Sequence, residues 1–262
     1  MILFISIFSM LNVSKGPIIK TIDISIKNLP VDNLSITQLS DLHLYPSTSK
    51  KTFDNIVNLT NFTNPDILVI TGDVFDFDDI DFITKNFDFS KFKAKYGIFA
   101  ITGNHEYYIK TENFFKIMKH FNIQVLDNRF QNVENIVNLI GIDDTENKKI
   151  NQQKILTEIN LQLDSNKNYS KLPKILLIHR PDIFDFASES GIDLQLSGHT
   201  HAGQIPPADI IEFIFFKYMV GLYSKNNKFN SKLYISPGTR FWGPPMRLFS
   251  KSEITKINLK KN

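Results

Sequence analysis

The chain has 262 residues, of which 42% are hydrophobic and 22% are charged, a composition typical of an ordinary globular protein. Its length suits one large α/β domain, because two domains would each have a small core. The net charge is only +3 and no long basic run is present, which argues against a nucleic-acid partner. The chain has no cysteine, so disulfides and thiolate metal sites are excluded, and a bound metal would need imidazole, carboxylate or amide ligands.

Residues 1–13 are almost wholly apolar, but a membrane-spanning helix needs about 20 such residues. They also lack the basic start and the small-residue cleavage site of a signal peptide. We expect residues 1–20 to form an apolar stub that is membrane-associated or ends a longer helix, ahead of one domain at residues 21–262. The alternative is that residues 1–13 form a strand of the core.

Short segments typical of strands recur along the chain, and each runs directly into polar residues. We predict strands at residues 35–40, 67–70, 97–101, 174–178 and 194–196. Helices are expected at residues 48–62, 111–121, 150–163 and 182–190. Strands that alternate with helices indicate sheets covered by helices, and ligands in such folds collect at the carboxyl ends of the strands.

Side chains that can bind a metal ion follow these predicted strands. Of the six histidines, all but His120 follow a predicted strand, and Asp41, Asp73 and Asn104 hold similar positions. Buried polar groups need partners, so this convergence indicates a metal centre better than core packing. Imidazole, carboxylate and amide ligands suit Mn, Fe or Zn, and their number favours two ions that share a bridging carboxylate.

Five motifs resemble those of calcineurin-like metallophosphoesterases. In chain order they are Asp41-Leu42-His43, Gly72-Asp73-Val74-Phe75-Asp76, Gly103-Asn104-His105-Glu106, His179 and Gly198-His199-Thr200-His201. Each motif is weak alone, but five in order are specific. Residues 196–204 and 241–247 further resemble the membrane-associated bacterial branch, whose members include phosphodiesterases and an enzyme that cleaves the pyrophosphate of UDP-diacylglucosamine. The resemblance implies an α/β fold, a four-layer α/β/β/α sandwich of two mixed sheets.

The same resemblance implies a role for each site residue. One metal ion would be held by Asp41, His43 and His201, the other by Asn104, His179 and His199, and Asp73 would bridge them. The catalytic residues would be His105, which acts on the leaving group, and Asp76, which orients it. Arg180 stands where branch members often have Gln and is a candidate to bind substrate phosphate.

We therefore predict a metal-dependent phosphoric ester hydrolase that uses two divalent transition-metal ions (Mn, Fe or Zn). It would cleave a phosphodiester or pyrophosphate bond by in-line attack of a metal-bridging hydroxide, on a lipid-linked or nucleotide-sugar substrate. The alternatives are a phosphoprotein phosphatase with the same metal site, which Phe77 after the second motif disfavours, and a non-catalytic metal-binding protein. We expect a membrane-associated monomer with no nucleic-acid partner.

Residues 210–220 form a second strongly apolar segment, interrupted only by Glu212 and Lys217. They are expected to form either a buried helix or an apolar flap beside the site. If they form a flap, this segment and the N-terminal stub would contact the lipid surface.

Overall fold

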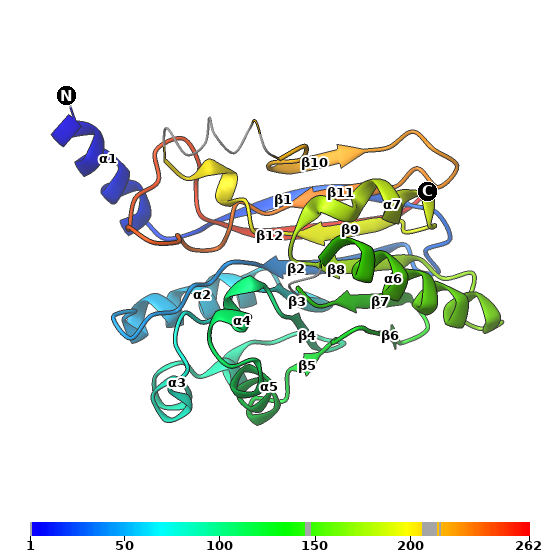
Figure 1. Cartoon of the computed structure of the whole chain (residues 1–262), viewed down its shortest axis with the longest axis horizontal. Helices are drawn as coiled ribbons and strands as arrows, with labels where there is room; N and C mark the ends of the chain where they lie inside the picture. The colour runs from blue at the N-terminus through cyan, green and yellow to red at the C-terminus, as the bar shows by residue number, and fades with distance from the viewer. Residues whose placement is uncertain (1, 145–147, 206–213, 215) are drawn as a thin grey trace.

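The computed structural model describes residues 2–144, 148–205, 214 and 216–262, and two mixed sheets packed face to face form its centre (Figure 1). The first sheet contains, in spatial order, β1 (Ile18–Ile26), β12 (Glu253–Lys261), β2 (Asn33–Leu39), β3 (Ile67–Thr71), β4 (Ile98–Ile101) and β5 (Gln124–Val125). The second sheet contains β10 (Gly221–Ser224), β11 (Lys232–Ile235), β9 (Leu194–Ser197), β8 (Lys174–Ile178), β7 (Val137–Ile142) and β6 (Arg129–Val133). Strands β2 to β5 are parallel in the first sheet, as are β11, β9, β8 and β7 in the second.

Helices cover the outer face of each sheet, which confirms the predicted four-layer α/β/β/α sandwich (Figure 1). The first sheet carries α2 (Lys50–Phe62), α3 (Ile80–Asn86), the short helix η1 (Phe89–Lys91) and α5 (Thr111–His120). The second carries α6 (Lys148–Ser165), η2 (Pro181–Ile183) and α7 (Phe184–Glu189). Two short helices lie at strand ends: α4 (Asn104–Tyr108) and η3 (His201–Gly203).

Three apolar layers hold the sandwich together. Between the sheets, Ile36, Val69 and Leu177 are fully buried. Outside the first sheet, Phe53 of α2 packs against Phe89, with ring centroids 4.9 Å apart. Burial of one such side chain stabilises the fold by about 1.5–3 kcal/mol, so the layers fix both sheets relative to each other. The carboxyl ends of their parallel strands consequently meet at one edge.

The N-terminal helix α1 (Ile2–Ser14) shows that the alternative of a core strand is wrong. Among its described side chains only Ser9 is buried, while apolar ones such as Phe8 and Leu11 are exposed. The Arg247 N–H donates to the Ser9 carbonyl at 3.1 Å, and the Asn12 side chain donates to the Arg247 carbonyl at 3.2 Å. No helix in the described ranges is long and apolar enough to cross a membrane.

The helices and strands predicted from the pattern of apolar and polar residues agree with the structure. The five predicted strands are confirmed as β2, β3, β4, β8 and β9, and the four helices as α2, α5, α6 and η2 with α7. Of the apolar segment at residues 210–220, residues 210–213 and 215 lie outside the described residues. Its described end, at residues 216–220, is not helical.

Candidate metal centre

The predicted metal ligands come from five strand ends that meet at one edge of the sandwich. In chain order, the strands that precede them are β2 for Asp41 and His43, β3 for Asp73, β4 for Asn104, β8 for His179, and β9 for His199 and His201. The structure brings all of these side chains together, although up to 160 positions of sequence separate them. His120 is exposed at the end of α5, away from this edge, as its helical position predicted.

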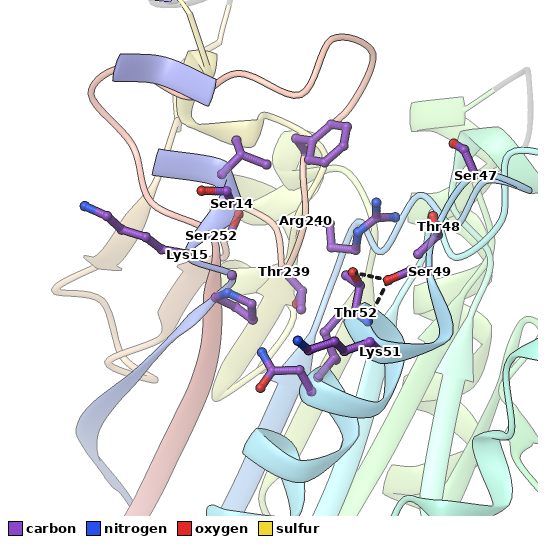
Figure 2. A pocket seen from close by; sticks show the side chains of 16 residues that line it. Ser14, Lys15, Ser47, Thr48, Ser49, Lys51, Thr52, Thr239, Arg240 and Ser252 are labelled. Atoms are coloured by element: carbon purple, nitrogen blue, oxygen red, sulfur yellow. Dashed lines mark hydrogen bonds between the residues drawn. The ribbon is translucent and has the colours of Figure 1, made fainter. Parts of the chain in front are cut away.

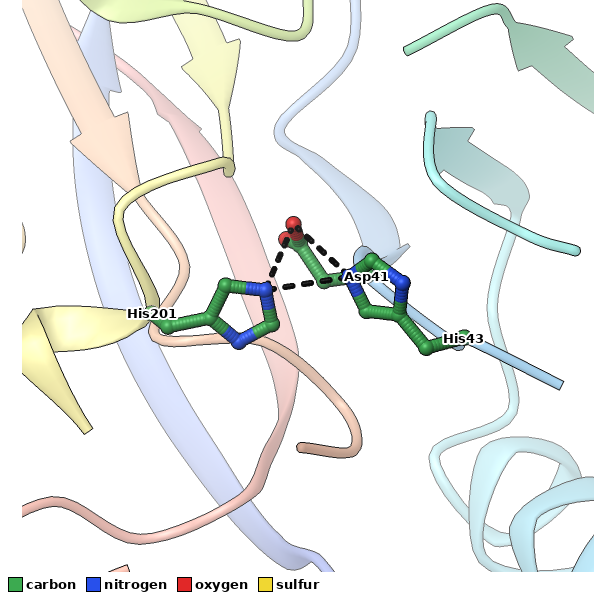
Figure 3. A group of neighbouring side chains, drawn as sticks. All are labelled: Asp41, His43 and His201. Carbon is green, nitrogen blue, oxygen red and sulfur yellow. Dashed lines mark hydrogen bonds and ion pairs between the residues drawn. The ribbon is translucent and has the colours of Figure 1, made fainter. Parts of the chain in front are cut away.

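Asp41, His43 and His201 form the first ligand group (Figure 3). Nε2 of His201 lies 3.1 Å from Nε2 of His43 and 3.4 Å from Oδ1 of Asp41. The other nitrogen of His43, Nδ1, is 3.0 Å from Oδ1 of Asp76, and donation of its proton to that carboxylate leaves a lone pair on Nε2. Two imidazole nitrogens and a carboxylate oxygen therefore face one point.

Asp73, His179 and His199 form the second group. Nδ1 of His179 donates to the Thr71 carbonyl at 2.8 Å, so Nε2 is left with a lone pair in the neutral ring. That Nε2 is 3.1 Å from Oδ2 of Asp73, and two facing lone pairs need a positive charge between them. Burial lowers the pKa of His179, but Asp73 and Asp41 outweigh it and raise this pKa to about 10, so either a proton or a metal ion beside Nε2 can supply this charge.

Asp73 lies between the two groups. Its Oδ2 is 3.7 Å from Nε2 of His43 in the first group and 3.1 Å from Nε2 of His179 in the second. Its Oδ1 accepts the backbone N–H of His105 at 2.9 Å, which fixes the carboxylate. Burial would raise the pKa of Asp73, yet His179 and His43 hold this pKa far below its usual range.

The donor set fits divalent transition metals. Two of the predicted ligand atoms, Oδ1 of Asn104 and Nε2 of His179, are buried without a hydrogen-bond partner in the described part of the chain. Burial, together with nearby cationic groups, lowers the pKa of His199 and of His201 well below the usual value, which keeps both imidazoles neutral. Neutral imidazole, carboxylate and amide groups are the ligands that such ions bind.

Several predicted metal ligands have a strained backbone conformation. Five predicted ligands have a left-handed conformation, with φ of 53° at Asp41, 38° at His43, 54° at Asp73, 74° at His199 and 49° at His201. Each such residue costs about 1–3 kcal/mol and persists only where its surroundings enforce it. A Cβ at Gly103 would lie 2.2 Å from Oδ1 of Asp73, so only glycine fits there. The cluster of strain marks a functional site.

His105 and Asp76, the predicted catalytic pair, are in direct contact. Nδ1 of His105 is 2.6 Å from Oδ1 of Asp76, and the same carboxylate also contacts Nδ1 of His43. Burial lowers the pKa of His105, but Asp76 and then Asp73 outweigh it, so this pKa is raised and the protonated form is favoured. Asp76 thus touches a predicted metal ligand as well as the histidine it was expected to orient.

Glu106 belongs to the third motif and supports the site, although no role was predicted for it. Its fully buried carboxylate accepts the backbone N–H groups of Asp73 at 2.9 Å, Val74 at 2.7 Å and Gly103 at 2.7 Å. It joins the loops after β3 and β4, which carry Asp73 and Asn104. Burial foremost, and then the charge of Asp73, raise the pKa of Glu106.

Arg180, the candidate phosphate ligand, and Arg247 both make contacts within the protein. Arg180 does not line the cavity at the metal centre, and its Nε donates to Asp144 at 2.8 Å. Its substrate-binding role stays a prediction. Arg247 is buried and donates to the carbonyls of Pro237 and Arg240, both at 2.6 Å. It also reaches the His201 carbonyl at 3.2 Å and so fixes that loop.

A cavity of about 370 Å³ opens over the ligand groups. The polar part of its lining comprises five of the seven predicted metal ligands and His105, and the aromatic part comprises Tyr108, Phe216 and Trp242. The Gln204 side chain forms two hydrogen bonds with the backbone of Trp242, of 2.7 and 2.9 Å, and holds that residue at the rim. The site therefore pairs a polar floor with an aromatic wall.

Comparison with known proteins relates this centre to a family. The chain is 32% identical over 268 residues to a Danio rerio protein named transmembrane protein with metallophosphoesterase domain. This alignment covers 98% of this chain and 60% of that protein. It is 34% identical over 263 residues to an uncharacterised metallophosphoesterase of Campylobacter jejuni, covering 98% and 67% respectively. The chain thus spans only part of the length of these relatives.

Among solved structures, the Plasmodium protein GAP50, described as the anchor in the inner membrane complex, aligns with a TM-score of 0.49 at 11% identity. That alignment covers 87% of this chain and 81% of the other. The family profile of the calcineurin-like phosphoesterases matches residues 34–203, which is more than half of the chain and contains every predicted metal ligand. The chain therefore belongs to the calcineurin-like phosphoesterase family.

Proposed function

We propose that the chain hydrolyses a phosphodiester or pyrophosphate bond with two divalent metal ions. The position of Asp73 carries this proposal, because its Oδ2 is within 3.7 Å of one ligand group and 3.1 Å of the other. A carboxylate oxygen shared in this way suits a two-metal site, whose ions, when bound, supply a hydroxide for in-line attack and neutralise the phosphate charge.

The chain's own residues complete the reaction. Asp41, His43 and His201 would hold one ion, Asn104, His179 and His199 the other, and Asp73 both. His105 lines the cavity and is held through Nδ1 by Asp76, so its Nε2 is free to give a proton to the leaving oxygen. Asp76 fixes the ring and the tautomer of His105.

The aromatic wall supports a substrate with an apolar group beside its phosphate, such as a lipid-linked substrate. Trp242 is 51% exposed and faces the same cavity as the ligands, so an apolar chain there would leave water while the phosphate reaches the polar floor. A nucleotide-sugar pyrophosphate could also place its planar base on this wall.

A turnover screen of the metal-loaded chain tests the proposed function. We expect kcat/KM to be highest for phosphodiesters or pyrophosphates that carry an apolar group.

Trp242→Ala keeps both backbone hydrogen bonds with Gln204 and should raise KM for such a substrate by about tenfold, with little change for a small aryl phosphodiester. Phe249→Ala is the matched control, because Phe249 lies in the same loop, is 81% exposed and does not line the cavity. A preference for phosphopeptides would instead support the phosphoprotein phosphatase.

We also propose that the chain associates with a membrane through α1. The described side chains of this helix are apolar and exposed at Ile7, Phe8 and Leu11, and the Danio rerio relative is named a transmembrane protein. Such a surface favours the boundary between lipid headgroups and acyl chains. The catalytic domain would then lie beside the bilayer as a monomer.

A further inference from the structure

A second cavity lies where the end of α1 meets the start of α2 (Figure 2). Its volume is about 380 Å³, and residues 13–17, the first turn of α2 and the loop between β11 and β12 form its walls. In Figure 2, Ser14 and Ser252 lie on one side, and Ser49, Lys51 and Thr52 on the other. The described residues that line it include none of the predicted metal ligands.

The lining of this cavity favours an anion. Its charged residues are all basic, namely Lys15, Lys51 and Arg240, and most of its other polar residues are serines and threonines. Arg240 is only 8% exposed, and its Nη1 donates to the carbonyls of Leu42 and His43, which ties this wall to the loop that carries His43. Cationic and hydroxyl groups with no carboxylate among the described lining residues match the hydrogen-bonding needs of a phosphate.

The start of α2 adds backbone donors. Ser49 caps this 13-residue helix by accepting the Thr52 N–H at 3.1 Å. The N–H groups of Lys50 and Lys51 have no hydrogen-bond partner among the described residues. Free N–H groups and the positive end of the helix dipole at such a position attract anions.

Ser252 gives independent evidence for a ligand. It lines the cavity, is only 6% exposed, and its hydroxyl forms no hydrogen bond with another group in the described part of the chain. The Ser252 oxygen is not one of the fully buried atoms that lack a partner, so it is accessible from the cavity and can donate to a ligand there. A ligand oxygen in the cavity would provide a hydrogen-bond partner for this hydroxyl.

We propose that this cavity binds the phosphate of an anionic phospholipid. The apolar helix α1 ends at Ser14, and the residues that follow it line the cavity. A lipid whose acyl chains contact α1 therefore has its headgroup beside Lys51 and Ser252. The lining of this cavity contains no predicted metal ligand, and lipid binding there does not depend on the hydrolase activity.

Co-sedimentation of the full chain with lipid vesicles tests the proposal. One set contains phosphatidylcholine alone, and the other has about one third phosphatidylglycerol, which we expect to bind the chain about tenfold more tightly or better. Lys51→Glu should lower binding to the anionic vesicles by about tenfold. Lys50→Glu is the matched control, since this exposed neighbour does not line the cavity, and it should change binding by less than about threefold. Ser252→Ala should weaken binding by about threefold with unchanged thermal unfolding.

The other outcomes are also decisive. Equal losses for Lys51→Glu and Lys50→Glu would show attraction by general surface charge and would overturn the site. If both vesicle sets bind equally while inorganic phosphate protects wild type but not Lys51→Glu against unfolding, the cavity takes free phosphate and the lipid assignment is wrong. Hydrolysis of an aryl phosphodiester should be unchanged in both lysine variants, which separates this result from a failure of the proposed function.

Discussion

Replacing Asp73 with alanine should remove nearly all bound metal and lower turnover of a phosphodiester by about three orders of magnitude or more. Its Oδ2 lies close to His43 in one ligand group and to His179 in the other, so its loss weakens both. Elemental analysis and steady-state rates on the same preparation measure the two effects together. Circular dichroism shows whether the variant is folded.

His199→Ala is the matched control, because His199 belongs only to the group that contains His179 and Asp73. It should empty mainly one site and leave about half of the metal bound. A folded Asp73→Ala chain that still holds one ion would contradict the bridging role. Equal metal loss in the two variants would show that the ligand groups do not form separate sites.

His105→Ala should keep both ions and the fold while lowering turnover by about two to four orders of magnitude, the range of a lost general acid. The reason is that Asp76 holds Nδ1 of His105 at 2.6 Å and that His105 is not one of the predicted metal ligands. Rates and metal content are measured in the same variant. Loss of a metal ion would show that His105 is a ligand.

The leaving group separates two roles for His105. An aryl ester leaves with little protonation, so its hydrolysis should fall much less than that of an alkyl ester if His105 donates a proton. If both rates fall equally, His105 acts only by electrostatic stabilisation of the phosphate. Asp76→Asn should reproduce the alkyl defect in part, because it removes the carboxylate that orients His105 and His43.

The metal-ligand positions could be predicted because each follows a short segment with the pattern of a strand. Strand β3, Ile67–Thr71, is buried at every position, and Asp73 follows it after one glycine. Such a strand is recognisable from local sequence alone. Parallel strands in layered α/β folds bring their carboxyl ends together, so strand ends far apart in sequence become neighbours.

The contacts of the supporting residues depend on tertiary packing and were not predicted from the sequence. Asp76 was expected to orient His105 alone, yet it also lies 3.0 Å from Nδ1 of His43. Glu106 is the third residue of α4, where a carboxylate often accepts N–H groups at the helix start, and that signal could have identified it. Arg180 is paired with Asp144, which belongs to none of the five motifs, and its expected contact with substrate stays a prediction.

Strand order also could not be predicted from local pattern. The C-terminal strand β12 inserts between β1 and β2, parallel to the first and antiparallel to the second. Alternating apolar residues indicate a strand but do not identify its partners. The apolar character of residues 1–13 likewise could not distinguish a helix from a core strand, whereas the structure shows an exposed helix.

Metal titration of the apoprotein tests the central claim most directly. Chelator-treated chain is titrated with Mn, Fe or Zn while bound metal and phosphodiester hydrolysis are measured at each addition. We expect activity to rise until about two ions are bound per chain, and to be absent at every ratio in Asp73→Ala. Saturation at one ion with full activity, or two bound ions with no hydrolysis of any phosphodiester or pyrophosphate, would contradict the account.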